Sequence, residues 1–63
     1  MSTKETKLKI KRRHEGLTQK EIAKTAKVSE RRYQDYEAGK SMPRADTAKL
    51  IALALNSTVE ELF

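Results

Sequence analysis

The sequence predicts an all-α fold, a compact bundle of about five short helices. Apolar residues recur at the three- and four-residue spacing of a helix, without the alternation of apolar and polar residues that marks a strand. Two Thr-x-x-Glu sequences have the form of a capping box, which begins helices, while two glycines and a single proline separate the segments. With 63 residues and no cysteine, the chain is expected to form one domain stabilised by helix packing or by a partner chain.

The first helix is expected from about Thr3 to His14. This helix is strongly basic. Leu8 should anchor it to the core, and Ile10 cannot help, because it does not share the face of Leu8. Gly16 then stops the segment.

A second and a third helix follow in close succession. Thr18 and Glu21 form the first capping box, so a helix is expected from about Thr18 to Thr25. After a break at Lys27, Ser29 is a good N-cap for a helix that should reach about Glu37 and end before Gly39. Residues three and four apart share a face of a helix, so one side of this helix should carry Tyr33, Tyr36 and Glu37, and the other Arg31 and Asp35.

Two further helices complete the expected bundle. Residues 40–43 form a loop, in which Pro43 sets up a helix from about Arg44 to Leu55. Thr58 and Glu61 form the second capping box, which begins a short terminal turn. The core should receive an apolar stripe from the fourth helix and three residues from the terminal turn: Ala48, Ile51, Ala52 and Leu55, with Val59, Leu62 and Phe63.

The distribution of charge points to a polyanionic partner. The chain has 14 Lys and Arg against 9 Asp and Glu, a net charge of +5. All the basic residues lie within residues 1–49, which carry a net charge of +7, and residues 50–63 carry −2. Such an asymmetry favours nucleic acid or an acidic membrane surface, although a lysine-rich solvated surface is equally common.

Several classes of protein fit the sequence poorly. No apolar run approaches the ~20 residues that a bilayer demands, and the N-terminal residues lack the apolar segment of a signal peptide, so a soluble cytoplasmic protein is expected. A basic amphipathic membrane binder would carry Trp or Phe near its cationic face. His14 is the single histidine, and there is no cysteine and no Gly-rich phosphate loop. We therefore expect no metal, no cofactor and no enzymatic activity.

Two short helices joined by a tight turn, the second with a polar outer face, can place a helix in the major groove of DNA. The runs Gly-Leu-Thr-Gln-Lys-Glu-Ile-Ala, Val-Ser, Tyr-Glu-Ala-Gly-Lys and Met-Pro-Arg-Ala-Asp-Thr resemble the Cro and CI phage-repressor family, also called the XRE-like helix-turn-helix family, from Leu8 to Phe63. The resemblance implies a lambda-repressor-like fold with the helix-turn-helix at residues 19–37, and a single DNA-binding domain over residues 1–63. It also implies a sequence-specific regulator of transcription that binds double-stranded DNA, more often a repressor than an activator.

The sequence departs from the family pattern at three positions. Lys27 occupies a turn position that is usually glycine, because the backbone there is left-handed, at a cost of ~1 kcal/mol. Tyr33 stands where a β-branched aliphatic residue is usual, so its hydroxyl must find water or a partner. Lys11 occupies a place that is often apolar.

The outward side of the third helix supplies the candidate base contacts. Arg31 is the strongest, since an arginine can donate two hydrogen bonds to guanine, while Glu30 or Asp35 could accept from a cytosine amino group. Arg31 and Asp35 can also form an i, i+4 ion pair, which is compatible with base contact because the pair can hold Arg31 in position. The full candidate set is Glu30, Arg31, Arg32, Gln34 and Asp35.

Phosphate contacts are expected from two places. Free amides at the start of the second helix, at Thr18 and Gln19, suit an anion, and the resemblance supports Gln19 in this role. Lys40 and Arg44 flank the third helix, and Arg44 could approach the minor groove. Lys20 is a further candidate, ahead of Arg13 and Lys27, and any one of these cations could equally be a solvated side chain.

The resemblance further implies a structural ion pair between Arg12 and Glu37, with solvation of both as the alternative. A symmetric dimer is expected, because Leu50 and Leu53 lie opposite the core stripe of their helix and Phe63 could add to the contact. Such a dimer would bind a near-palindromic operator, and so small a chain should have no small-molecule effector. Two alternatives stay open: an antitoxin that regulates its own operator, and a protein-interaction adaptor that has kept the fold without reading DNA.

Overall fold

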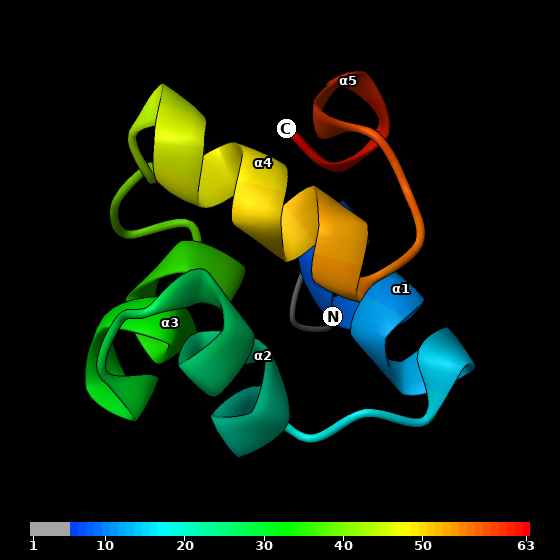
Figure 1. Ribbon diagram of the computed structural model, residues 1–63, viewed down its shortest axis with the longest axis horizontal. Coiled ribbons are helices and arrows are strands. Elements are labelled where there is room, and N and C mark those ends of the chain that lie inside the picture. Colours follow the sequence, from blue (N-terminus) through cyan, green and yellow to red (C-terminus); the bar gives the residue numbers. More distant parts are fainter. Residues whose placement is uncertain (1–5) are drawn as a thin grey trace, which may run out of the picture.

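The computed structural model describes residues 6–63, and in this part of the chain every regular element is an α-helix (Figure 1). The helices are α1 (Lys7–Glu15), α2 (Gln19–Ala26), α3 (Glu30–Glu37), α4 (Ala45–Ala54) and α5 (Val59–Leu62). α2 packs against both α3 and α4, while α1 contacts α3 and α5 and so closes the bundle behind α4. The expectation of an all-α bundle is therefore confirmed.

α1 begins later in the chain than expected. Thr6 is extended, with ψ of 158°, and its hydroxyl accepts a hydrogen bond from the Lys9 N–H at 3.2 Å. The expected start at Thr3 lies outside the described residues, and because Thr6 is extended the helix begins at Lys7. Gly16 follows the last residue with φ of 72°, so it ends α1 as expected.

α2 and α3 begin where the sequence predicts. The Thr18 hydroxyl accepts from the Glu21 N–H at 3.1 Å, and the Glu21 carboxylate accepts from the Thr18 N–H at 2.8 Å, which completes the first capping box. The Ser29 hydroxyl accepts from the Arg32 N–H at 3.1 Å and caps α3. Between them, Lys27 adopts the expected left-handed conformation, with φ of 62°.

The C-terminal helices follow the expected boundaries within one residue, with one correction. Arg44 is extended and caps α4 without a side-chain hydrogen bond. The Thr58 hydroxyl accepts from the Glu61 N–H at 3.2 Å, but the Glu61 carboxylate accepts from the Ser57 hydroxyl at 2.8 Å. The second capping box is thus only half formed, because the neighbouring hydroxyl takes the carboxylate.

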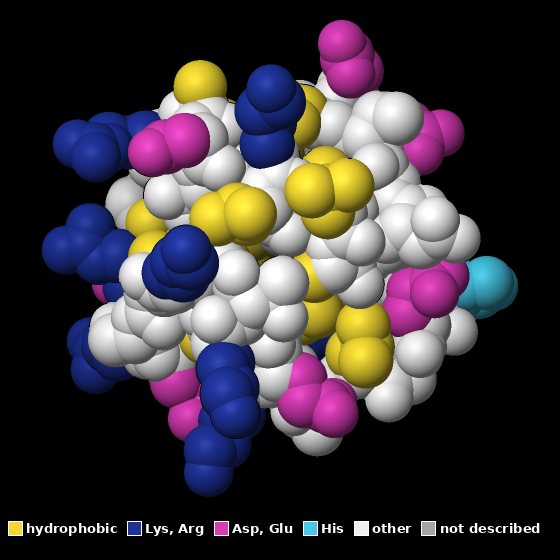
Figure 2. Space-filling view, in the orientation of Figure 1, with side chains coloured by type: hydrophobic (Ala, Val, Ile, Leu, Met, Phe, Trp, Pro, Cys, Tyr) yellow, Lys and Arg dark blue, Asp and Glu magenta, His cyan; other side chains and the backbone are white. Residues whose placement is uncertain are grey.

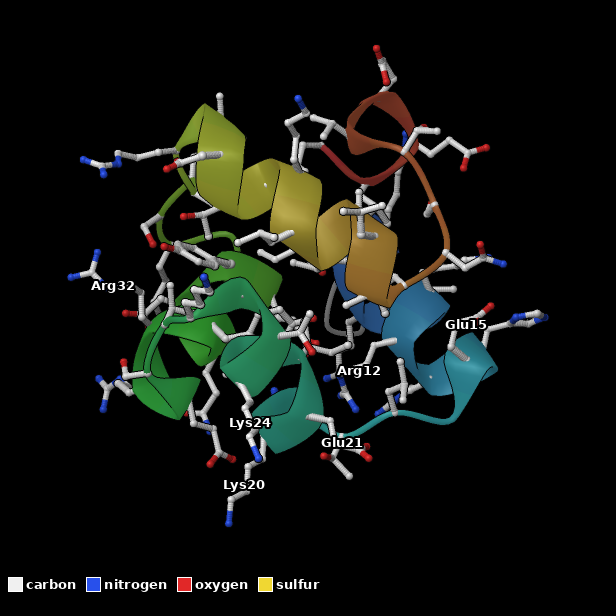
Figure 3. All side chains as sticks on the ribbon, viewed as in Figure 1. Arg12, Glu15, Lys20, Glu21, Lys24 and Arg32 are labelled. Carbon is white, nitrogen blue, oxygen red and sulfur yellow. The ribbon has the colours of Figure 1, made fainter. Side chains whose placement is uncertain are left out.

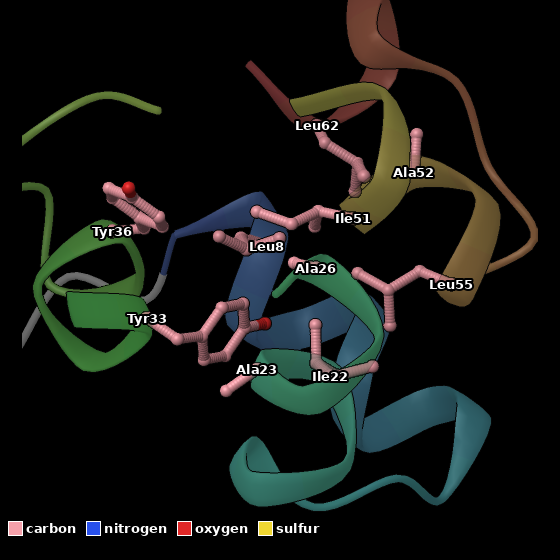
Figure 4. Close-up of a cluster of buried hydrophobic side chains, with 10 residues drawn as sticks. All are labelled: Leu8, Ile22, Ala23, Ala26, Tyr33, Tyr36, Ile51, Ala52, Leu55 and Leu62. Carbon is pink, nitrogen blue, oxygen red and sulfur yellow. The ribbon is translucent and has the colours of Figure 1, made fainter. Parts of the chain in front are cut away.

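All five helices contribute to one core (Figure 4). The expected stripe of α4 is buried, as are the tyrosines of α3. One expectation needs correction: Leu50 is half-buried and packs against the core, so it does not lie on an open face. Leu53, by contrast, is 73% exposed. The core cluster consists of Leu8, Ile22, Ala23, Ala26, Tyr33, Tyr36, Ile51, Ala52, Leu55 and Leu62.

None of the helices formed by residues 6–63 has the length and apolar character needed to cross a membrane.

Candidate nucleic-acid interface

The turn between α2 and α3 brings these two helices into close contact. The N–H groups of Lys27 and Val28 donate to the carbonyls of Lys24 and Ala23 at 3.2 and 3.0 Å, which reverses the chain within three residues. Ala23 is buried in the core cluster, and Val28 packs against that cluster. The core therefore fixes the two helices on one side, and the opposite side of α3 faces solvent.

The two sides of α3 differ sharply in burial, as the spacing predicts. Tyr33, Tyr36 and Glu37 are buried. Opposite them, Asp35 is half-buried, and the other polar residues of the helix are exposed: Glu30, Arg31, Arg32 and Gln34. α3 thus presents a continuous polar surface of five side chains, the same five that the sequence predicts as base contacts.

A shallow recess lies on this outward surface. It is lined by side chains of α3 and its cap, together with one residue from the loop that follows: Ser29, Arg31, Arg32, Asp35 and Ser41. Sequence reasoning missed Ser41, because nothing local says that the loop after Gly39 folds back beside the start of α3. Arg31 and Asp35 form an ion pair in this recess, with 3.7 Å between Nε and Oδ1.

Gln19, expected at a phosphate, turns toward the protein interior. Its Nε2 donates to Glu37 Oε1 at 3.1 Å, and its side chain is half-buried. The Thr18 and Glu21 N–H groups are already taken by the capping box. The backbone amides of Gln19 and Lys20 are the ones at the start of α2 that the helix geometry leaves for an anion.

Glu37 is the centre of a buried polar network. Its residue is 4% exposed, and its carboxylate accepts from Arg12 Nε at 2.5 Å and from Arg12 Nη2 at 3.4 Å. The remaining Arg12 nitrogen, Nη1, donates to the Leu17 carbonyl at 2.8 Å, and the Thr6 hydroxyl donates to the Glu37 carbonyl at 2.8 Å. The structure thus contains the ion pair that the resemblance implies, which ties α1 to the end of α3, and the hydrogen bond from Gln19 adds α2.

Tyr33 lies beside this network with its ring fully buried (Figure 4). Its hydroxyl makes no hydrogen bond to any of the described residues. Burial raises the pKa of Tyr33 well above its usual value, and the nearby Glu37 carboxylate raises it further. The hydroxyl therefore stays protonated at neutral pH and adds no charge to the core.

Cationic side chains gather on one side of the molecule. Figure 2 shows most of the visible Lys and Arg along the left and lower edges, over α2, α3 and the start of α4. In Figure 3, Arg32 points away from α3 into solvent and Lys20 and Lys24 point away from α2, while Arg12 points between the helices. Lys24 was not among the expected contacts, although its position four residues after Lys20 places it on the same face. Lys40, in the loop after α3, and Arg44, at the cap of α4, are exposed.

The described residues contain no group of three or more His, Cys, Asp or Glu side chains that could hold a metal ion.

A family model described as helix-turn-helix matches residues 8–62, which extend from the second residue of α1 to the last residue of α5. No curated protein and no solved structure matches the chain.

Proposed function

Since the chain belongs to the Cro/CI-like helix-turn-helix family of DNA-binding transcription regulators, we propose that it reads the major groove of an operator with α3 and represses transcription. The observation that carries this proposal is the division of α3 into a buried face and a polar, solvent-facing one. A helix held in this way can enter the groove without disturbing the core.

The proposed base contacts come from the outward face of α3. Arg31 is the principal one, because its side chain is 80% exposed and its guanidinium can donate to O6 and N7 of guanine. Glu30, Arg32 and Gln34 lie on the same exposed surface and complete the set, and Asp35 is half-buried beside Arg31. These contacts supply the sequence preference.

The proposed phosphate contacts surround that face. They are the start of α2, with Gln19 and Lys20, and the two cations after α3, Lys40 and Arg44. Thr18, which was expected among them, gives its N–H and its hydroxyl to the Glu21 carboxylate. Because one Nε2 hydrogen of Gln19 is donated to Glu37, its share of the contact is assigned to the backbone N–H and to the second Nε2 hydrogen. These contacts orient the protein on DNA and contribute affinity without sequence preference.

The protein is proposed to act as a symmetric dimer on a near-palindromic operator, in the cytoplasm. Leu53 and Phe63, with the exposed part of Leu50, are the proposed contact between two copies. The single domain of residues 1–63 acts by binding alone, without a cofactor, an effector or a catalytic step.

The test begins with selection of bound duplexes from a random pool, followed by competition between the selected and random DNA. Arg31→Ala should relax the sequence preference by about 1 to 3 kcal/mol, while Lys40→Ala should weaken binding to all duplexes about equally. Affinity should fall with salt, with a slope of about −0.9 in log K against log salt for each phosphate neutralised. If no duplex binds at low salt, DNA recognition is rejected and the adaptor is the better explanation.

A co-purification experiment, in addition to the DNA-binding assay, separates the antitoxin alternative. An antitoxin would bind an operator equally well, and would in addition form a stable complex with the product of a neighbouring gene. Co-purification of such a product at a fixed stoichiometry would replace the simple repressor by an autoregulator.

A further inference from the structure

We propose that Asp35 is a positioning residue that holds the Arg31 guanidinium for recognition of a guanine, and that it does not itself contact a base. The proposal rests on the proposed function and refines it, because it gives the base contact to Arg31 and the positioning of the Arg31 side chain to Asp35. It also names the target, a G·C pair in each half of the operator.

The geometry of the pair supports this division. Arg31 and Asp35 are one turn apart on the outward side of α3, and 3.7 Å separates Arg31 Nε from Asp35 Oδ1. With Nε turned to the carboxylate, the two Nη groups form the free end of the planar guanidinium. Those two groups can donate to guanine O6 and N7 at once, so the ion pair and the base contact use different nitrogens of one side chain.

Reach separates the two residues. The Arg31 side chain is 80% exposed, whereas that of Asp35 is 35% exposed and lies against the recess that Ser29, Arg32 and Ser41 also line. Aspartate is shorter than arginine by several bonds, so Arg31 extends well beyond the Asp35 carboxylate. A base edge that contacts the end of the Arg31 side chain therefore does not reach the recess in which Asp35 lies.

Charge gives a second reason. A carboxylate on a surface that faces phosphates repels DNA, and the other charges around the recess, on Arg31 and Arg32, are cationic. An aspartate there lowers affinity for every duplex unless it contributes something specific. Ordering a long, flexible arginine is such a contribution, because the side chain then loses less conformational freedom when it binds.

The experiment uses the duplex selected by the parent protein and a second duplex in which the G·C pair protected by Arg31 is changed to A·T. Asp35→Asn, Arg31→Ala, the double variant and Glu60→Gln are compared by their affinity ratio for the two duplexes at one salt concentration. Glu60→Gln is the matched control, since it removes the same charge from an exposed position on α5. A bidentate arginine discriminates by about 5- to 150-fold, so Arg31→Ala should abolish a ratio in that range.

Asp35→Asn should lower the ratio about 5- to 10-fold, within the range that one bidentate pair provides, and raise affinity for the changed duplex about two-fold through the lost repulsion. In the Arg31→Ala background it should leave the ratio unchanged. Glu60→Gln should keep the parent ratio. A purely structural role for Asp35 would move both affinities in the same direction.

Two results would overturn the proposal. Asp35→Asn could leave the ratio at the parent value, which would make the ion pair irrelevant to reading, or it could lower the ratio equally with and without Arg31, which would make Asp35 a base contact. The proposed function fails separately, if the parent binds no duplex or if Arg31→Ala keeps the parent ratio, and either outcome removes this proposal as well.

Discussion

Lys27 carries the most unusual backbone conformation in the helix-turn-helix. Its φ of 62° lies in the left-handed region, which costs a residue with a Cβ atom about 1 kcal/mol relative to glycine. The chain accepts this cost because the N–H groups of Lys27 and Val28 close the end of α2 on the carbonyls of Lys24 and Ala23. The strained backbone of Lys27 therefore fixes the orientation of α3 relative to α2.

We expect Lys27→Gly to raise the free energy of unfolding by about 0.5 to 1 kcal/mol, the relief of strain less the greater flexibility of the unfolded chain. Urea denaturation followed by circular dichroism measures the change. Lys27→Ala is the matched control, because it removes the same charge and keeps the Cβ atom, so it should show no such gain. Equal stabilities of the two variants would show that the backbone conformation is not the cause.

Tyr33 places a polar atom in the centre of the core without a protein partner. Removing a buried hydroxyl that lacks a hydrogen bond removes a desolvation cost, so Tyr33→Phe should raise the free energy of unfolding at pH 7 by about 1 kcal/mol. A loss of more than 1 kcal/mol would show instead that the hydroxyl donates to the Glu37 carboxylate in solution.

The difference in stability between the parent and Tyr33→Phe should depend on pH, because the pKa of Tyr33 is raised in the folded protein. Above pH ~10, tyrosine in the unfolded chain loses its proton while the buried one keeps it, so the unfolded state is favoured as the pH rises. The parent should therefore lose stability above pH ~10 relative to Tyr33→Phe, and the two should differ by a constant amount below it. Denaturation curves at pH 7, 9 and 11 compare them directly.

The junction of α1, α2 and α3 depends on one carboxylate. Glu37 is almost fully buried and draws on Arg12 from α1 and Gln19 from the start of α2. Burying a charge is favourable only when it is paired and hydrogen-bonded, and the network meets that condition. The end of the proposed recognition helix is thus held by the same group that turns Gln19 inward.

Arg12→Ala should lower the free energy of unfolding by about 3 to 5 kcal/mol, since it leaves the Glu37 charge buried without its partner. Lys11→Ala is the control from the same helix. It breaks the partly exposed Lys11 to Glu15 pair, 3.3 Å between Nζ and Oε2, and should cost no more than about 0.5 kcal/mol. Equal losses for the two variants would mean that the Arg12 pair contributes no more than a surface pair.

Helix boundaries were predictable wherever a local signal decides them. Thr18 with Glu21, Ser29 and Gly16 each act on amides or carbonyls within a few residues, so the sequence is enough to place them. The start of α1 was not predictable in the same way, because Thr3 and Thr6 are equally good caps by type.

Features that depend on contacts between distant segments could not be predicted from the sequence. Gln19 binds Glu37, 18 residues away, and this changes its expected role at the phosphate. Ser41 reaches the recess of α3 only because the loop folds back, and Leu50 is half-buried because it packs against the core cluster. The outward residues of α3, by contrast, follow from helical spacing alone.

The two ends of the molecule differ in charge and in apolar exposure. Residues 50–63 contain no Lys or Arg, and the exposed Leu53 lines a shallow recess with Lys49, Val59 and the cap of α5. Figure 2 shows apolar side chains on the face over α4, away from the cationic edge. Two copies can therefore meet through this end while both cationic edges stay available to DNA.

A two-fold dimer through Leu53 and Phe63 would place two copies of α3 about 34 Å apart, one turn of DNA, and each copy would bind half of a near-palindrome. Because part of Leu50 packs against the core, the contact between the two copies is small, and we expect it to form mainly on the operator.

Leu53→Glu puts a charge on each side of the two-fold axis, so the two copies repel each other. It should keep the parent affinity for a half-site and lose the gain in affinity that the full palindrome gives. Analytical ultracentrifugation with and without the duplex counts the copies bound, and Ile10→Glu, an equally drastic change at a 53% exposed position on α1, should leave both values unaltered. A parent that binds one copy per palindrome, with Leu53→Glu binding as tightly, would show that this end of the molecule faces solvent in the working protein.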